Sequence, residues 1–128
     1  MVKRYDVDGV VSPGGRYSHV SETKPGARFY HLAGRTGIHP DGTIGKNFKE
    51  QAELVYANLK QILKECGMTF DNLVKTTVYL VDPDDKLAHR EVQKIALGDV
   101  VPPSTLLIVK GLAMPELLIE VDAIAARD

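Results

Sequence analysis

The chain has 128 residues, a length typical of one domain with its own hydrophobic core. Hydrophobic residues make up 44% of the chain and charged residues 26%, which excludes the composition of a disordered protein. The formal net charge is −1, with no block of positive charge of the kind that binds nucleic acid. We therefore expect a single domain over residues 1–128 that has no nucleic-acid partner.

The sequence shows no pattern of a secreted, membrane or disulfide-bonded protein. Residues 1–6 lack the apolar run of a signal peptide, and no later apolar stretch approaches the roughly 20 residues needed to span a bilayer. Cys66 is the only cysteine, which excludes an intrachain disulfide, and its place on an apolar helical stripe predicts a buried, unreactive thiol. We expect a cytoplasmic protein without a membrane partner.

The first predicted elements are two strands. Residues 28–35 read as a strand running into Gly34, and a weaker strand is predicted around residues 17–21. The turn residues Lys24, Pro25 and Gly26 separate the two segments. This arrangement predicts a hairpin between them.

A long amphipathic helix follows. Its apolar positions recur every 3.6 residues and end at Gly67, which suits a C-terminal cap. They are Phe48, Ala52, Val55, Leu59, Ile62, Leu63 and Cys66. The opposite positions are charged, so we expect only one side of this helix to pack against the protein.

The second half of the chain predicts three further strands and one helix. Residues 73–81 are rich in β-branched side chains and predict a central strand. A helix is expected from Pro83, with Asp82 as its N-cap, to Gly98. Its predicted buried stripe contains Leu87, Ala88, Val92, Ile95 and Ala96. Strands over residues 105–109 and 117–125 complete the chain.

These elements predict an α+β fold in which two one-sided helices cover one face of a four- to six-stranded sheet. On the last strand, Leu118 and Ile124 share one face with Glu120 and Asp122, while Leu117, Ile119 and Val121 lie on the other. The face without helices therefore keeps apolar side chains. A second copy of the chain is the simplest cover for it.

Most of the familiar catalytic patterns are missing from the sequence. His19, His31, His39 and His89 follow no metal-ligand spacing, so we expect no metal. Gly14 and Gly15 do not open a helix after a strand, which argues against a nucleotide cofactor. There is no G-x-S-x-G motif for a covalent nucleophile. We expect no cofactor of any kind.

The remaining candidates are polar residues at strand ends, namely Tyr17, His19, Arg35, Ser104, Thr105 and Glu120. A carboxylate such as Glu120 within an apolar strand needs a partner or a raised pKa, which is common at functional sites. The alternative is a structural ion pair across a subunit contact. Arg35 directly follows Gly34, where a guanidinium could bind a ligand carboxylate, or it is a solvated loop residue.

Four segments together resemble the Rid (YjgF) family of enamine and imine deaminases. They are residues 15–18, residues 32–34, the run DNLVKTTVYL at residues 71–80 and the run LIEVDAIA at residues 118–125. The last two are specific in combination. The resemblance implies the chorismate-mutase-like fold, a mixed sheet with two helices on one face, assembled as a trimeric barrel with a small-molecule pocket between subunits.

The resemblance also implies roles for individual residues. Tyr17 matches the family's pocket tyrosine, and Glu120 matches the glutamate that positions the attacking water. The family's carboxylate-binding arginine belongs to a motif of proline, any residue, arginine and serine, and Ser104 stands in its place. A hydroxyl cannot replace a guanidinium. We therefore expect Arg35, beside Gly34, to carry the charge, with Ser104, Thr105 and His19 also binding substrate.

Three functions follow from this resemblance. The first is a hydrolase that deaminates a small imine or enamine, with Glu120 and Tyr17 as catalytic residues. The second is a non-catalytic protein that binds a small molecule in the same pocket. The third is an endoribonuclease, against which the near-neutral charge and the absence of a histidine pair argue.

Overall fold

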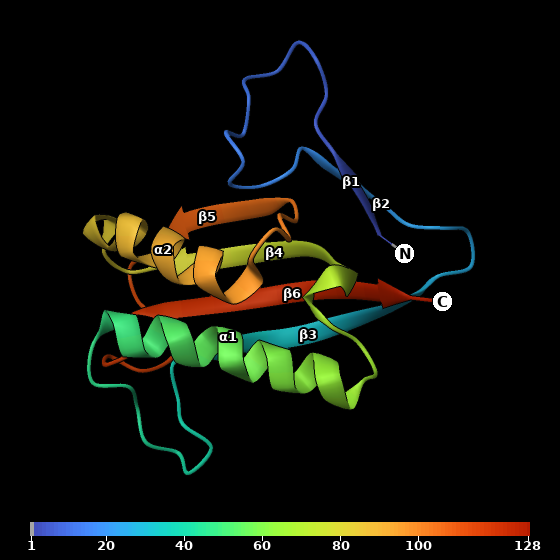
Figure 1. Ribbon diagram of the computed structural model, residues 1–128. Coiled ribbons are helices and arrows are strands. Elements are labelled where there is room, and N and C mark those ends of the chain that lie inside the picture. Colours follow the sequence, from blue (N-terminus) through green and yellow to red (C-terminus); the bar gives the residue numbers. More distant parts are fainter. Residues whose placement is uncertain (1) are drawn as a thin grey trace.

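Two helices lie on one face of a mixed four-stranded sheet in the computed structural model, which describes residues 2–128 (Figure 1). In spatial order the strands are β3 (Arg28–Thr36), β6 (Ile119–Arg127), β4 (Leu73–Leu80) and β5 (Ser104–Ile108). β6 is antiparallel to both neighbours and β5 is parallel to β4. This architecture confirms the predicted α+β class with α1 (Phe48–Glu65) and α2 (Lys86–Leu97) on one face.

The N-terminal segment forms a separate two-stranded sheet. β1 (Lys3–Tyr5) pairs with β2 (Val20–Glu22), and β3 pairs with β6, so the predicted hairpin between residues 17–21 and 28–35 is wrong. A three-residue strand such as β1 is too short to show alternation, and its role as the partner of β2 could not be seen. Ser21 Oγ donates to the carbonyl of Val74 at 2.6 Å, which holds this segment against β4.

α1 follows the predicted pattern closely. Asn47 caps it by accepting from the Glu50 amide at 2.9 Å, and Gly67 follows its end with a φ of 72° that favours glycine. The predicted stripe packs against the sheet, with Val55, Leu59 and Leu63 fully buried. Cys66, at the C-cap, packs against the core but is only partly buried, so its thiol is less buried than the sequence predicts.

α2 is rotated relative to the prediction. Asp82 caps a short 3-10 helix, Pro83–Asp85, and α2 begins only at Lys86. Of the predicted stripe, Val92 is buried and Ala88 and Ala96 pack partly buried against the core, as expected. Leu87 and Ile95 are instead 67% and 86% exposed, while His89 and Leu97 are buried. The rotation directs His89 toward Tyr56 of α1, and their Nε2 and Oη atoms lie 2.7 Å apart in a hydrogen bond. Pattern analysis missed this face because it treats histidine as polar.

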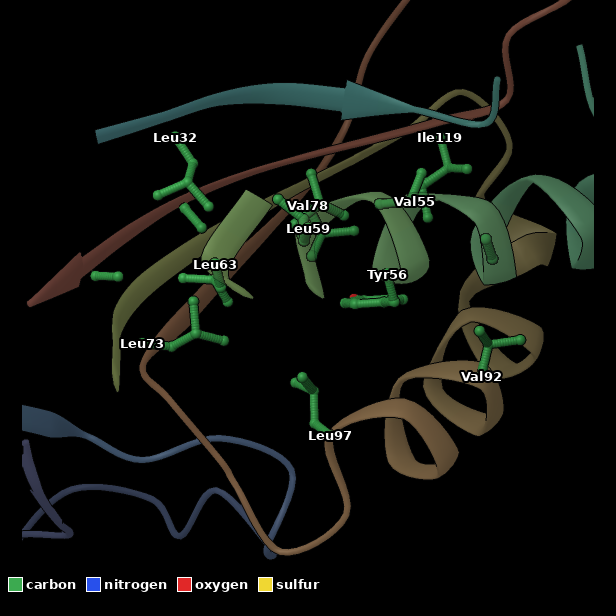
Figure 2. Packing of buried hydrophobic residues seen from close by; sticks show 14 of the residues in the cluster. Leu32, Val55, Tyr56, Leu59, Leu63, Leu73, Val78, Val92, Leu97 and Ile119 are labelled. Carbon is green, nitrogen blue, oxygen red and sulfur yellow. The ribbon is translucent and has the colours of Figure 1, made fainter. Parts of the chain in front are cut away.

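The core lies between the helices and the sheet, where Tyr56 projects from α1 toward α2 (Figure 2). We call the helix-packed side of the sheet the covered face and the other side the open face. On β6, Ile119 and Val121 are fully buried on the covered face, while Glu120 and Asp122 lie on the open face, as the sequence predicts. The open face also exposes 50% of Phe29 and 45% of Leu107. None of the helices within residues 2–128 combines the length and apolar character needed to cross a bilayer.

Candidate small-molecule site

A cavity of about 400 Å³ opens between α2, the start of β5 and the loop that precedes β2. It lies at the β5 edge, on the side of the sheet that α2 covers, because its β-strand residues Val78 and Leu106 are partners on that face. Its polar lining consists mainly of Arg16, Tyr17, Lys86, Arg90, Gln93 and Ser104. Two of the residues predicted for the site, Tyr17 and Ser104, therefore lie in one cavity.

The loop bearing Tyr17 is held beside β5 by its neighbours. Ser18 is buried and its Oγ donates to the carbonyl of Val101 at 2.6 Å. The backbone amide and Nε of Arg16 both donate to the carbonyl of Pro13 at 3.3 Å, which closes a turn. Gly14 and Gly15 form this turn with φ values of 65° and 78°, which glycine adopts without strain. The turn places Arg16 and Tyr17 together at the cavity.

His19 supports this loop and does not line the cavity. Its Nδ1 accepts from the amide of Val7 at 3.1 Å, and its Nε2 lies 2.9 Å from the carbonyl of Val11. A neutral imidazole with its proton on Nε2 satisfies both contacts. His19, expected as a substrate ligand, therefore lies outside the lining of this cavity and has two bonds within its own loop.

Ser104 and Thr105 point to opposite sides of the sheet. Ser104 Oγ accepts from Thr76 Oγ1 at 3.0 Å, and Thr76 is buried on the covered face. Thr105 pairs with Thr77, and its Oγ1 accepts from Lys75 Nζ at 2.9 Å on the open face. The alternation of a strand allows only one of the two to line the cavity, and that residue is Ser104.

Three cations give the cavity its charge. Arg16, Lys86 and Arg90 line it, and no acidic side chain of residues 2–128 does. His89 also lines the cavity, but burial, together with the charge of Arg90, lowers its pKa to about 4. Burial raises the pKa of its partner Tyr56, so the buried pair is neutral at physiological pH.

Glu120 and Gly34 meet on the open face. Glu120 stands opposite Tyr79 of β4 and Thr36 of β3. Its carboxylate lies against Gly34, where a Cβ atom would overlap Oε2, so a residue larger than glycine would displace it. Tyr79 donates to Asp122 Oδ2 at 2.9 Å, and this bond, with burial and the charges of both acids, raises the pKa of Tyr79.

Arg35 does not line the cavity. It pairs with Val121 on β6, and its Nε donates to the carbonyl of Gly34 at 3.0 Å. The positive charge at the Ser104 cavity comes from Arg16, Lys86 and Arg90, which sequence reasoning missed. The sequence did hold a signal for two of these cations. On α2, Lys86, Arg90 and Gln93 recur at helical spacing and form one polar stripe.

Comparison with known proteins places these features in a family. The family model for endoribonuclease L-PSP matches residues 10–127. The chain belongs to this family. A RutC family protein from Pyrococcus abyssi is 36% identical over 118 residues, covering 91% of this chain and 90% of the relative.

Two further proteins are similar to this member of the endoribonuclease L-PSP family. A mouse protein named 2-iminobutanoate/2-iminopropanoate deaminase is 30% identical over 102 residues, covering 78% of this chain and 75% of the relative. The crystal structure of YyfB from Yersinia pestis, a Rid family protein of unknown function, has a TM-score of 0.88 and 27% identity, covering 98% of each chain. The Rid resemblance and the predicted mixed sheet with two helices on one face are thereby confirmed.

Proposed function

We propose that this protein hydrolyses a small imine or enamine in a pocket formed between two subunits of a homotrimer. The observation that carries the proposal is the placement of the two groups of site residues. Tyr17 and Ser104 line the cavity on the covered side of the sheet, whereas Glu120 and Gly34 lie on the open face. Because the sheet separates them within one chain, they can act on one ligand only if they come from different subunits.

The open face supplies a reason for subunits to associate. It exposes Phe29 and Leu107 beside the polar side chains of Glu120 and Asp122. An apolar surface of this kind is covered most simply by another copy of the same chain. We expect a homotrimer of 14.0 kDa subunits, and light scattering coupled to gel filtration measures it. A stable monomer would contradict the shared pocket.

In this proposal Glu120 acts as the general base. Its carboxylate takes a proton from water as the water oxygen bonds to the carbon of the C=N group, and the nitrogen gains a proton. The resulting carbinolamine then loses ammonia and becomes a carbonyl compound, so one water is consumed for each ammonia released. Tyr17 donates a hydrogen bond to the ligand, and Arg16, Lys86 and Arg90 hold its acidic group. The reaction named for the mouse relative supports this choice.

Ammonia release from a panel of enzymatically generated imines tests the proposal. Glu120→Gln should lower kcat/KM by about a hundredfold or more, because the amide cannot accept the proton. Asp122→Asn is the matched control, since Asp122 shares the open face two residues further along β6, and it should change the rate far less.

An absence of ammonia release would favour the non-catalytic binding protein over the hydrolase. If the oligomeric wild-type protein accelerates ammonia release from no imine in the panel, the proposed hydrolase is wrong. Binding of small anions in the same sample would then favour the non-catalytic binding protein, because the cavity keeps three cations. The ribonuclease alternative has no support from the cavity, where the described chain places His89 in a neutral, buried pair with Tyr56.

A further inference from the structure

The cavity beside α2 holds more positive charge than one carboxylate needs. Arg16, Lys86 and Arg90 line it, and none of them forms a salt bridge with an acid within residues 2–128. Arg16 spends one of its N–H groups on the carbonyl of Pro13, which leaves the outer nitrogens of its guanidinium for a ligand. A concave surface that gathers three cations without acids is built to attract negative charge.

The shared pocket of the proposed function adds one negative charge from the protein. If Glu120 of a neighbouring subunit faces this cavity, it offsets one of the three cations, and two positive charges remain. A ligand with a single carboxylate would leave one of them without a partner. A ligand with two negative charges would match the site, and complementary charge is how such sites select among similar ligands.

The positions of Lys86 and Arg90 along α2 suggest how the two negative charges are arranged. Lys86 and Arg90 are four residues apart on α2, which is about 6 Å along the helix axis. This rise is comparable to the separation of the carboxylates in an extended five-carbon diacid. A phosphate ester also carries two charges, but it concentrates them on one group, so it is the competing ligand class in the binding test.

A second cavity continues from the first. It has a volume of about 390 Å³ and shares Arg16, Arg90 and Gln93 with the first cavity. The two arginines therefore stand at the boundary of the two spaces, and a ligand anchored on them has room to extend beyond Ser104. The lining of this second cavity also contains the cation Lys94 and the acid Asp99, whereas no acid of residues 2–128 lines the first cavity.

We infer that the ligand of this site is a small dicarboxylate, held by Lys86 at one end and by Arg90 with Arg16 at the other. The inference rests on the proposed function for the identity of the site, and it names the substrate class as imines of dicarboxylic 2-amino acids. Hydrolysis of such an imine consumes water and releases ammonia and a 2-oxo diacid.

Binding of stable ligands tests the inference without turnover. Calorimetry at low ionic strength compares 2-oxoglutarate with 2-oxopentanoate, which has the same five-carbon chain but a methyl group in place of the second carboxylate. We expect 2-oxoglutarate to bind at least about tenfold more tightly. Arg90→Gln should remove most of that preference, whereas Lys60→Gln, which makes the same charge change outside the cavity, should keep it.

Several results would overturn the inference. Equal affinity for the two oxo acids, or no binding of either, would show that the cavity does not select a second carboxylate. Tighter binding of glycerol phosphate than of 2-oxoglutarate would assign the cations to a single phosphate. Dissociation of the oligomer by both Arg90→Gln and Lys86→Gln would show that the cations hold the subunits together.

Turnover separates this inference from the proposed function. The imines formed from glutamate and norvaline differ in the same way as the two oxo acids, and we expect faster ammonia release from the glutamate imine. Equal rates would contradict the dicarboxylate inference and leave the hydrolase standing. A retained binding preference for 2-oxoglutarate without any ammonia release would contradict the hydrolase alone.

Discussion

The two faces of β6 differ in what their side chains do. Ile119 and Val121 are completely buried against the helices, where each atom has a packing partner in the same chain. Glu120 and Asp122 alternate with them on the open face and are only half-buried. One strand thus contributes the centre of the core and, on its other side, the candidate catalytic carboxylate. The difference teaches that the covered face determines the fold of one chain, while the open face is the surface that the proposed homotrimer would cover.

The largest stability effect is expected on the covered face. Leu59 is fully buried between α1 and the sheet, and Leu59→Ala should lower the free energy of unfolding by about 2–5 kcal/mol through lost burial and a residual cavity. Urea denaturation measures it. Ile95→Ala on the exposed side of α2 is the control and should cost less than about 0.5 kcal/mol. Similar losses for both variants would contradict the described packing.

A smaller effect is expected at a polar group within the covered side. Gln51 is buried and makes three hydrogen bonds to the backbone. Its Nε2 donates to the carbonyls of Gly45 and Glu116, both at 3.0 Å. Its Oε1 accepts from the amide of Leu118 at 2.8 Å. Gln51→Leu leaves these backbone groups without a partner and should cost about 1–3 kcal/mol.

The exposed Gln61, on the same helix, provides the comparison for this change. Its side chain contacts only Glu65 among the described residues, so Gln61→Leu should leave the urea midpoint almost unchanged. If Gln51→Leu has the same urea midpoint as the wild type, the three hydrogen bonds of Gln51 do not stabilise the fold.

The smallest effect over a single pH unit concerns the buried pair between the helices. The pKa of His89 falls from an ordinary 6.5 to about 4 in the folded chain, because of burial and the charge of Arg90. Between these values the unfolded state binds more protons, so stability should fall as the pH drops from about 6.5 to 4, by at most about 1.4 kcal/mol per pH unit.

Urea unfolding as a function of pH tests this expectation. His89→Gln removes the titrating group and keeps a side chain that can bond to Tyr56, so its stability should depend less on pH in this window. Asp41 and Glu50 also lose stabilisation in acid, since hydrogen bonds lower their pKa values, but they do so in both proteins. Identical pH profiles would show that His89 is not the sensitive group.

The sequence predicted the covered side of the molecule well. The stripe of α1 and the alternation of β6 follow from the placement of apolar residues, and burial of such residues is what forms these elements. The prediction failed where a polar contact decided the geometry. α2 buries His89, which bonds to Tyr56, and leaves Leu87 exposed, and β2 pairs with the short strand β1.

The candidate site was predicted only in part for a related reason. Tyr17, Ser104 and Glu120 were singled out as polar residues at strand ends and matched to the family, but the sequence could not show that the sheet separates the first two from the third. The expectation that Arg35 binds a ligand carboxylate stays a prediction, since Arg35 lies beside Gly34 and outside the cavity, whose cations are Arg16, Lys86 and Arg90. Which residues share a cavity depends both on the alternation of the strands and on the rotation of the helices. A shift of one residue in the predicted register of a strand or helix places different side chains in the cavity.

The central claim is that the two halves of the pocket come from different subunits, and subunit mixing tests it most directly. A variant with Tyr17→Phe and Arg90→Gln loses one half, and Glu120→Gln loses the other, so each alone should release little ammonia. When the two are unfolded and refolded together, about one quarter of the shared pockets should contain both native halves, and activity should recover to about that fraction of the wild type. Mixed oligomers that are as inactive as their parents would contradict the claim.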